Sequence, residues 1–370
     1  MEEKTMQKVK MKRTKMDKFL YKFEIVRLLI AVVIAFGVSF AILAMFTPHP
    51  VQAIRDLIIG PLTSVRRFST VIEKAIPLTF AGLAVSVMFR ANQFNLAAEG
   101  ALYFGSLVAA TIAIFMGGHP IFVTIVAILS AGVVGSIITA IPGYLKVKWN
   151  VSELVVSIML NTIILYFGTY LFNHYIRDIN SAYAASYPFR DGVGLPVLLK
   201  NTRLHLGIVI VAIFVIAVNF FINKTKWGYK ITVTGNNEEF AKSVGMNTPR
   251  IIMLAQLVGG FVAGIGGGVE MLGLYTRFQW MALPGFGFDG VVLNIIAKGN
   301  PKFIPLAAIF VSYIRIGADY MYRQSGVAPE IVAIIEGILI ILIAANAFLA
   351  KWRHKMTVDI STRELNKEVA

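Results

Sequence analysis

Long apolar runs separated by short polar segments constrain the fold of this chain more than any other feature. A membrane-spanning helix needs about 20 predominantly apolar residues. About ten runs approach that length, of which the second and the eighth are short: residues 28–46, 75–89, 97–116, 120–144, 152–173, 205–222, 251–274, 286–298, 303–321 and 329–350. The eighth suits a re-entrant or broken helix as well as a full span. We therefore expect an all-α, polytopic membrane protein with about ten transmembrane helices.

The composition and the charge pattern favour the same class of protein. Apolar residues make up 57% of the chain and the mean hydropathy is +0.71, whereas soluble domains are about 45–50% apolar. A net charge of +15 would suggest nucleic-acid binding in a soluble protein, but here the 35 Lys and Arg residues gather mostly between alternate apolar runs. The positive-inside rule then makes both termini and the loop 223–250 cytoplasmic. We expect a multi-pass plasma-membrane protein that contacts lipid and binds no nucleic acid.

The predicted domain organisation follows from these runs. A basic cytoplasmic N-terminal segment (1–27) precedes one transmembrane domain (28–350), and a cytoplasmic tail (351–370) follows it. No pattern typical of an enzyme is present: the sequence has no cysteine, its five histidines have no metal-ligand spacing, and no Gly-Lys dipeptide of a phosphate-binding loop occurs. We expect no catalytic residue, no metal site and no directly bound cofactor.

Matching motifs in the two halves of the chain predict an internal repeat. Ser152–Ile158 and Pro329–Ile335 open the fifth and tenth runs, and Phe94–Gly100 and Phe286–Gly290 open the third and eighth. The halves are runs two to five and seven to ten, offset by an odd number of spans, so the repeats would be inverted. Inverted repeats with acidic residues at matching helix starts indicate a transporter with its path at the repeat interface.

Acidic side chains at or inside the apolar runs are candidates for that path, because charges are costly in lipid. They are Glu99, Glu153, Glu270, Asp289, Asp319, Glu330 and Glu336. Capping is the competing explanation for the four that lie in or near a first helical turn, Glu99, Glu153, Asp289 and Glu330. Glu270 and Glu336 lie deeper. Arg315 and Asp319 are spaced i,i+4 and are expected to pair with each other.

Amide and aromatic side chains at the same breaks are the other candidates for the path. Asn95, Asn161 and Asn294 can bind a purine or a sugar hydroxyl without a charge cost, although bonding between helices is the commoner use of such amides. Phe94, Phe286 and Phe288 flank the breaks and can stack on a base, although packing is the usual role of phenylalanine in a membrane helix. Both interpretations stay open for each residue.

The polar loop 223–250 carries a short helical pattern of its own. Asn236 to Val244 can form about two turns, started by Gly235-Asn236 and stopped by Gly245. One interpretation is a solvated amphipathic connector. The other is a lever that receives force from a partner protein and passes it to the helices on either side.

Four motifs in order resemble the permease subunits of ABC importers for branched-chain amino acids, simple sugars and nucleosides. They are Phe94-Asn-Leu-Ala-Ala-Glu-Gly100, Val156-Val-Ser-Ile-Met-Leu-Asn161, Thr234-Gly-Asn-Asn-Glu-Glu-Phe-Ala-Lys-Ser-Val-Gly-Met246 and Pro284-Gly-Phe-Gly-Phe-Asp-Gly290. The last one, closed by Gly299-Asn-Pro301, is most similar to the nucleoside (guanosine-type) branch. The resemblance covers roughly residues 75–350. Ser152-Glu153 departs from the Asn-Glu of many relatives, which argues against a substrate role for Ser152.

The resemblance implies partners and a division of labour. Loop 223–250 would hold the coupling helix that inserts into an ATP-binding cassette subunit, with the coupling residues Gly235, Glu238, Glu239, Ala241 and Gly245. That partner would bind and hydrolyse ATP. A second permease chain, expected to be a paralogue, and an extracytoplasmic binding lipoprotein facing the outer loops would complete the importer. The path residues would be those named above: Phe94, Asn95, Glu99, Glu153, Asn161, Phe286, Phe288, Asp289 and Asn294.

The competing hypothesis is an ion-coupled secondary transporter of a small polar solute. Inverted five-helix repeats also occur in that class, and Glu270, Glu336 or Glu153 would then bind a proton or sodium ion without any ATPase. Within the ABC class, a simple sugar or a branched-chain amino acid is the alternative substrate to a nucleoside.

Overall fold

The computed structural model describes residues 30, 33–34 and 37–344. The predicted N-terminal segment 1–27, the tail 351–370 and the outer ends of the first and last apolar runs lie outside these residues. The chain divides into two compact units. Unit 2 is Ile59–Ile316, and unit 1 comprises the residues before it and after it.

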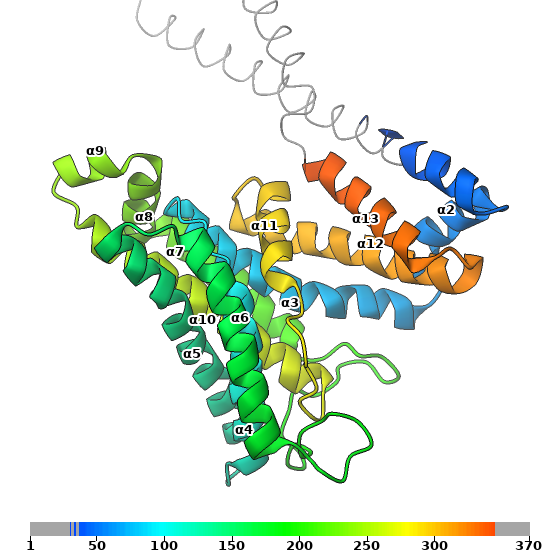
Figure 1. Ribbon diagram of the computed structural model, residues 1–370, viewed down its shortest axis with the longest axis horizontal. Helices are drawn as coiled ribbons and strands as arrows, with labels where there is room; N and C mark the ends of the chain where they lie inside the picture. The colour runs from blue at the N-terminus through cyan, green and yellow to red at the C-terminus, as the bar shows by residue number, and fades with distance from the viewer. Residues whose placement is uncertain (1–29, 31–32, 35–36, 345–370) are drawn as a thin grey trace, which may run out of the picture. The chain divides into compact units, whose positions relative to one another are not determined.

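Every regular element of the described residues is a helix (Figure 1), which confirms the predicted all-α class. The helices are α2 (Pro50–Ile59), η1 (Gly60–Leu62), α3 (Val65–Arg90), α4 (Ala98–Phe115), α5 (Pro120–Trp149), α6 (Glu153–Leu171), η2 (Phe172–Ile176), α7 (Gly207–Lys224), α8 (Lys226–Asn236), α9 (Glu238–Ser243), α10 (Thr248–Leu274), α11 (Phe286–Ile296), η3 (Pro301–Phe303), α12 (Ile304–Ser325) and α13 (Pro329–Ala344). A further short apolar helix is Gly37–Phe46.

Seven of these helical segments are long and apolar enough to cross a membrane. They are Val65–Arg90, Ala98–Phe115, Pro120–Trp149, Glu153–Ile176, Gly207–Lys224, Thr248–Leu274 and Pro301–Ser325. Gly37–Phe46 and Phe286–Ile296 are shorter apolar helices. The chain is therefore a multi-pass membrane protein, and each of the ten predicted apolar runs overlaps a helix of the described residues.

The second run shows the largest difference from the prediction. Its helix, α3, begins at Val65 rather than near residue 75, because Ser64 adopts an extended conformation and its side chain accepts a hydrogen bond from the Arg67 N–H. The first turns of α3 carry charged residues, so these turns do not count as part of an apolar run. The amphipathic helix α2 was not predicted, since its ten residues are too few for a span and include the charged Arg55 and Asp56.

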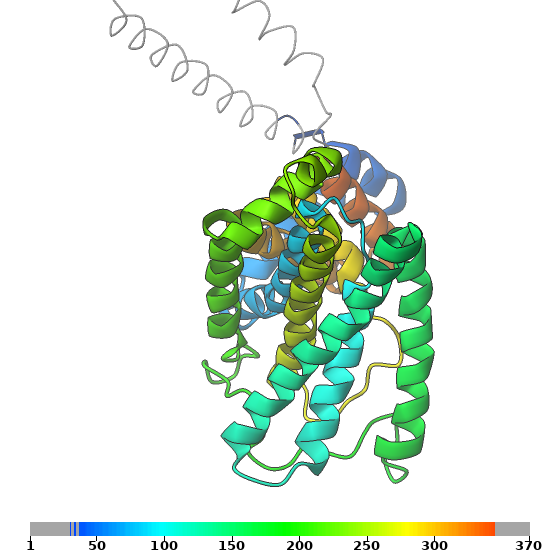
Figure 2. The same ribbon diagram turned by 90° about the vertical axis from the view of Figure 1, so that its left-hand side faces the viewer.

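The core of unit 2 is built on α10. This helix packs against α5, α4 and α3, and α4 also packs against α5. In Figure 2, α5 crosses the front of the bundle and α6 descends along one edge of it. Helix α3 is the most buried of the seven long helices, with 89% of its apolar window inside the protein, against 22% for α6 and for α7. Helices α6 and α7 thus present most of their surface to the surroundings.

Glycines allow α5 and α10 to approach each other closely. A Cβ atom added at Gly260 would collide with Thr139 Oγ1, and one at Gly264 would collide with the Ala131 carbonyl oxygen. Thr139 Oγ1 also donates to the Gln256 carbonyl oxygen at 2.8 Å. The glycine-rich stretch of α10 is therefore a helix-packing surface, as small residues in membrane helices usually are.

Unit 1 has its own contacts. A Cβ atom at Gly317, in α12, would collide with the carbonyl oxygen of Leu57 in α2, so these two helices touch at the backbone. Near the end of α12, Ser325 Oγ donates to Asp56 Oδ2 at 2.7 Å. The side chain of Glu336, a predicted path residue in α13, lies outside the described side chains.

Candidate functional site

A non-helical break between α3 and α4 is held by one face of α6. The chain from Ala91 to Ala97 is not helical, although α3 and α4 on either side are both apolar and long. Three α6 side chains spaced four residues apart bind the backbone of this break, since residues at i and i+4 share a helix face. The bonds are Phe94 N–H to Glu153 Oε1 (3.1 Å), Leu96 N–H to Ser157 Oγ (3.0 Å), Gly100 N–H to Asn161 Oδ1 (3.0 Å) and Asn161 Nδ2 to the Leu96 carbonyl (3.0 Å).

Asn95 ties the other side of the break to α5 and α10. Its Nδ2 donates to Gln256 Oε1 at 2.7 Å and to the Thr139 carbonyl oxygen at 3.2 Å. Its Oδ1 accepts from the Ala97 N–H at 2.8 Å. The Asn95 side chain is fully buried, so all of its visible bonding capacity serves the protein itself. Such satisfied amides fix a local backbone shape at low energetic cost.

Glu99 joins this break to the start of α11. Its Oε1 accepts from the Gly285 N–H at 2.6 Å, and its Oε2 accepts from the Gly287 N–H. Gly285 has a φ of 85°, a left-handed conformation that favours glycine. The predicted capping role is therefore found, but the carboxylate caps α11 instead of its own helix α4. It places a negative charge at the positive end of the α11 dipole.

The remaining path candidates divide into exposed rings and buried polar groups. Phe94 and Phe288 are exposed, and the Phe94 ring centroid lies 4.7 Å from that of Phe89. The Phe286 ring contacts Trp280 edge to face, at 6.3 Å between centroids. Asn294 is buried, and its Oδ1 has no hydrogen-bond partner among the described residues.

The ion pairs of α11 and α12 differ from the predicted pairing. Arg315 forms a bidentate pair with Asp289 (2.6 and 2.7 Å), and Asp319 pairs with Arg323 at 3.1 Å. The prediction paired Arg315 with Asp319 of the same helix, but the bidentate partner of Arg315 is Asp289. Asp289 serves an arginine of the next helix, which a search for i,i+4 spacing cannot find.

A second group of buried polar side chains lies apart from the break, in α3, α10 and the loop before α7. Glu73 is completely buried, and neither carboxylate oxygen has a hydrogen-bond partner in the described part of the chain. Glu270 is almost completely buried, and one of its oxygens likewise has no hydrogen-bond partner in that part of the chain. Sequence reasoning singled out Glu270 but missed Glu73, which precedes the second apolar run.

His205 belongs to the same buried group. It is fully buried, its Nδ1 accepts from the Gly207 N–H at 3.1 Å, and its Nε2 has no partner among the residues described. Burial lowers the pKa of His205 to about 4, because the charged imidazolium is poorly solvated there. The imidazole is therefore neutral at pH 7. In the sequence His205 stands between Leu204 and Leu206 at the edge of the sixth apolar run, and its lack of metal-ligand spacing predicted no role for it.

The loop 223–250 folds into two helices that extend from one end of the bundle (Figure 1). Helix α8 was not predicted. Helix α9 was, and Asn237 caps it by accepting from the Phe240 N–H at 2.9 Å. Gly245 ends it with a φ of 79°. Glu238 and Glu239 hold Lys242 at 3.1 Å each, and the bonds from these carboxylates raise the pKa of Lys242.

The five predicted coupling residues have different surroundings. The Glu239 side chain is 85% exposed, whereas that of Glu238 is 44% exposed and accepts from Thr248 Oγ1 at 3.2 Å. Ala241 is buried. A Cβ atom at Gly235 would collide with the Arg90 carbonyl oxygen, so α8 touches the end of α3 at this point. Helix α9 is therefore anchored by small residues and presents its acidic face outward.

A family comparison decides what kind of protein carries these features. Residues 67–344 match the family described as the permease component of the branched-chain amino acid transport system. The chain belongs to this family. The predicted family resemblance is confirmed, and as a permease the chain is a transport component rather than a catalytic one.

Three relatives of the permease have named transport functions. The guanosine ABC transporter permease protein NupP of Bacillus subtilis is 30% identical over 74% of this permease and 80% of its own length. The nucleoside ABC transporter permease protein NupB of Lactococcus lactis is 28% identical over 86% and 90%. The glucose ABC transporter permease protein TsgB13 of Haloferax volcanii is 27% identical over 89% and 90%.

Proposed function

We propose that this permease is the translocation subunit of an ATP-driven importer of nucleosides. The observation that carries the proposal is its similarity to guanosine and nucleoside permeases along most of the chain. The Gly-Phe-Gly-Phe-Asp-Gly stretch that resembles the nucleoside branch forms the capped start of α11. The glucose permease is nearly as similar, so a simple sugar is the second candidate substrate.

The proposed path runs along the break between α3 and α4 and the start of α11. Exposed Phe94 and Phe288 supply faces on which a base can stack. Asn294 supplies a buried amide oxygen that has no hydrogen-bond partner among the described residues. Asn95, Asn161, Glu99 and Glu153 bind backbone, so we assign them the role of shaping the path rather than contacting the solute.

The proposed energy source is a separate ATP-binding cassette subunit that receives α9. Its outward carboxylates and the small residues behind them suit a helix that docks as a rigid unit. We further propose about ten spans in two inverted repeats, cytoplasmic termini, a paralogous second permease chain and an extracytoplasmic binding lipoprotein. No cofactor binds this chain directly in the proposed importer, and ATP acts through the partner.

The docking role of α9 is tested by co-purification with the neighbouring subunits co-expressed. Glu239→Arg is the informative variant, because this side chain contacts only Lys242 in the described structure and its loss should leave α9 folded. We expect the variant to lose the ATPase while the native chain retains it. Asp191→Arg, an exposed reversal in the loop before α7, is the control and should retain it.

Transport measurements then separate the candidate functions. The complete importer in vesicles should take up radiolabelled guanosine only with ATP, and excess unlabelled glucose should not compete. Competition by glucose would favour the sugar importer. Uptake that survives ATP depletion but stops when the ion gradient is collapsed would favour the ion-coupled transporter.

A further inference from the structure

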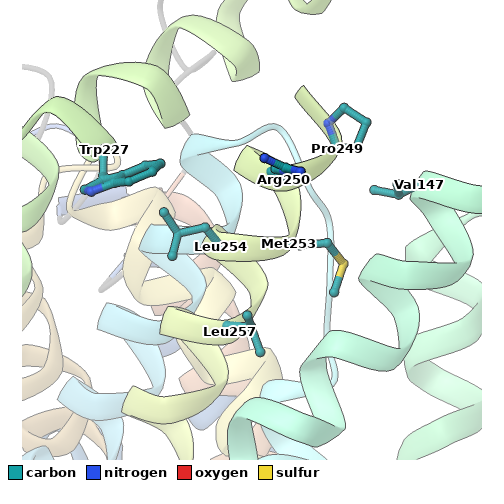
Figure 3. Close-up of a pocket in the computed structure, with 7 residues that line it drawn as sticks. All are labelled: Val147, Trp227, Pro249, Arg250, Met253, Leu254 and Leu257. Carbon is teal, nitrogen blue, oxygen red and sulfur yellow. The ribbon is translucent and has the colours of Figure 1, made fainter. Parts of the chain in front are cut away.

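An apolar groove lies beside the base of α8, away from the proposed solute path. It has a volume of about 370 Å³ and is lined by residues of α5, α8 and α10: Val147, Trp227, Pro249, Arg250, Met253, Leu254 and Leu257. Figure 3 shows Trp227 on one side, Val147 on the other, and the α10 residues forming the floor between them. All of these elements belong to unit 2.

The floor of the groove changes from charged to apolar along α10. Arg250, Met253, Leu254 and Leu257 recur at intervals of three and four residues and so share one helix face. Arg250 lies in the first turn of α10, and Leu257 lies about 10 Å further along the helix axis at 1.5 Å per residue. Because α10 is one of the membrane-spanning candidates, the apolar end of the groove lies toward the hydrocarbon and the charged end toward the headgroups.

The charged end of the groove is strongly positive. Arg250 is exposed, and the residues that the structure describes place no carboxylate within ion-pair distance of its guanidinium. The Nζ atoms of Lys226 and Lys230 lie 5.8 and 5.1 Å from the Trp227 ring centroid. The first turn of α10 contains no acidic residue, and a helix start adds partial positive charge. The nearby acidic residues of α9 already hold Lys242.

We infer that this groove binds one anionic phospholipid. An acyl chain would lie on Met253, Leu254 and Leu257, and the headgroup phosphate would lie near Arg250. Trp227 suits the boundary between the two, because tryptophan prefers the level of the headgroups. A protein partner would fit the exposed acidic face of α9 better than an apolar groove that runs along a membrane-spanning helix.

The inference rests on an apolar floor that runs along α10 and on the basic residues at one end of it. Basic residues at a membrane surface attract anionic lipids by roughly 1 kcal/mol each, equivalent to about fivefold in affinity. A zwitterionic lipid would use the floor but gain little from the mouth. The site therefore discriminates by headgroup charge, and it does so without depending on which solute the permease carries.

Tryptophan quenching tests the inference on the full-length permease in mild detergent. Phosphatidylglycerol with brominated acyl chains should quench Trp227, and the part of the quenching lost in Trp227→Phe reports this groove among the four tryptophans. We expect phosphatidylglycerol to bind at least about fivefold more tightly than phosphatidylcholine. Equal quenching by the two lipids at all concentrations would overturn the inference.

Two variants separate the headgroup from the acyl chain. Arg250→Gln should weaken phosphatidylglycerol binding about fivefold and leave phosphatidylcholine unchanged, whereas Leu254→Phe should fill the floor and weaken both. Arg177→Gln and Leu129→Phe, exposed residues of the same types elsewhere, are the matched controls and should change neither. An Arg250→Gln variant with native selectivity would overturn the inference. Glycerol phosphate added as a competitor gives a further test. If it fully protects Trp227 from quenching by the brominated lipid, the inference is also overturned, since the free headgroup then occupies the site without an acyl chain.

Discussion

Two groups of buried polar side chains in unit 2 differ in whether the described structure gives them hydrogen-bond partners. At the break between α3 and α4, Glu99 and Asn161 bond backbone groups at both ends of the segment. In the other group, Glu73 and His205 are equally buried, yet Glu73 lacks any hydrogen-bond partner in the described structure and His205 Nε2 lacks one too. The first group fixes one backbone shape. The second group contains buried polar atoms without partners in the described structure. A different conformation of the protein can supply these partners, or a bound proton can neutralise the group.

The strongest way to break this comparison is Glu99→Ala. It leaves the partly buried Gly285 N–H and the buried Gly287 N–H without an acceptor and removes the charge that caps α11. At about 1–3 kcal/mol for each lost partner, we expect the unfolding free energy to fall by about 4 kcal/mol, as measured by denaturant titration in detergent. Glu99→Gln keeps one acceptor oxygen and should lose clearly less; an equal loss in both variants would contradict the capping role.

The pH dependence of stability tests the opposite group through His205. Its pKa falls from 6.5 to about 4 on folding, so the unfolded state binds a proton between these values while the folded state does not. His205 therefore makes its full contribution to the free energy of unfolding above pH 6.5. This contribution falls by about 3 kcal/mol in total as the pH falls toward 4.

His205→Asn provides the control for this pH effect. Its side-chain oxygen can still accept from the Gly207 N–H two residues later. The difference between the native and variant unfolding free energies, measured at pH 7.5 and at pH 4.5, should shrink at the lower pH. A difference that stays constant across this range would show that His205 titrates normally in the folded protein.

Asn161→Ala gives the next largest expected effect. The change removes one acceptor and one donor from the backbone of the break, and we expect a loss of about 2 kcal/mol. Asn161→Asp keeps an acceptor for the Gly100 N–H, and when neutral its O–H can donate to the Leu96 carbonyl, although with a shorter reach than two amide hydrogens allow. It should bring back part of the loss at a pH where the new carboxyl is neutral, and recovery of none of it would argue that packing, not bonding, is the role of Asn161.

The smallest effect is expected for Glu73→Gln, and it sharpens the comparison most. No hydrogen bond of the described structure is lost, and a buried carboxyl group that can ionise is replaced by a neutral amide. We expect the unfolding free energy to change by no more than about 1 kcal/mol, toward greater stability. The same Glu→Gln change at position 99 should destabilise. If both substitutions destabilise alike, the two groups do not differ in the way proposed here.

The sequence was sufficient to predict most of the long apolar helices and α9, but not α2, α8 or the partners of the polar residues. Apolar length and capping residues are local properties, so α9 with its stop at Gly245 was predicted closely. Glu99 was predicted to cap a helix, but a first-turn position cannot reveal that the helix is α11, 186 residues away. Likewise, i,i+4 spacing favoured Arg315 with Asp319, whereas the bidentate pair with Asp289 depends on how α11 meets α12.

Glu73 shows a different limit of sequence reasoning. A predicted apolar run ends where charged residues begin, so a charged residue at its edge is assigned to solvent. Its burial arises because α3 begins about three turns before the run and its buried positions begin at Ser69. Only a three-dimensional arrangement determines which helix edge is covered.

The glycine contacts between α5 and α10 have a mechanical consequence. Because backbone atoms of the two helices interlock at Gly260 and Gly264, neither helix can slide along the other without first separating from it. A displacement applied at α9, which leads directly into α10, must then move both helices together as one stiff beam. A rigid helix pair transmits a small displacement along its whole length. Asn95, near the break between α3 and α4, is bonded to this pair through Gln256 and Thr139.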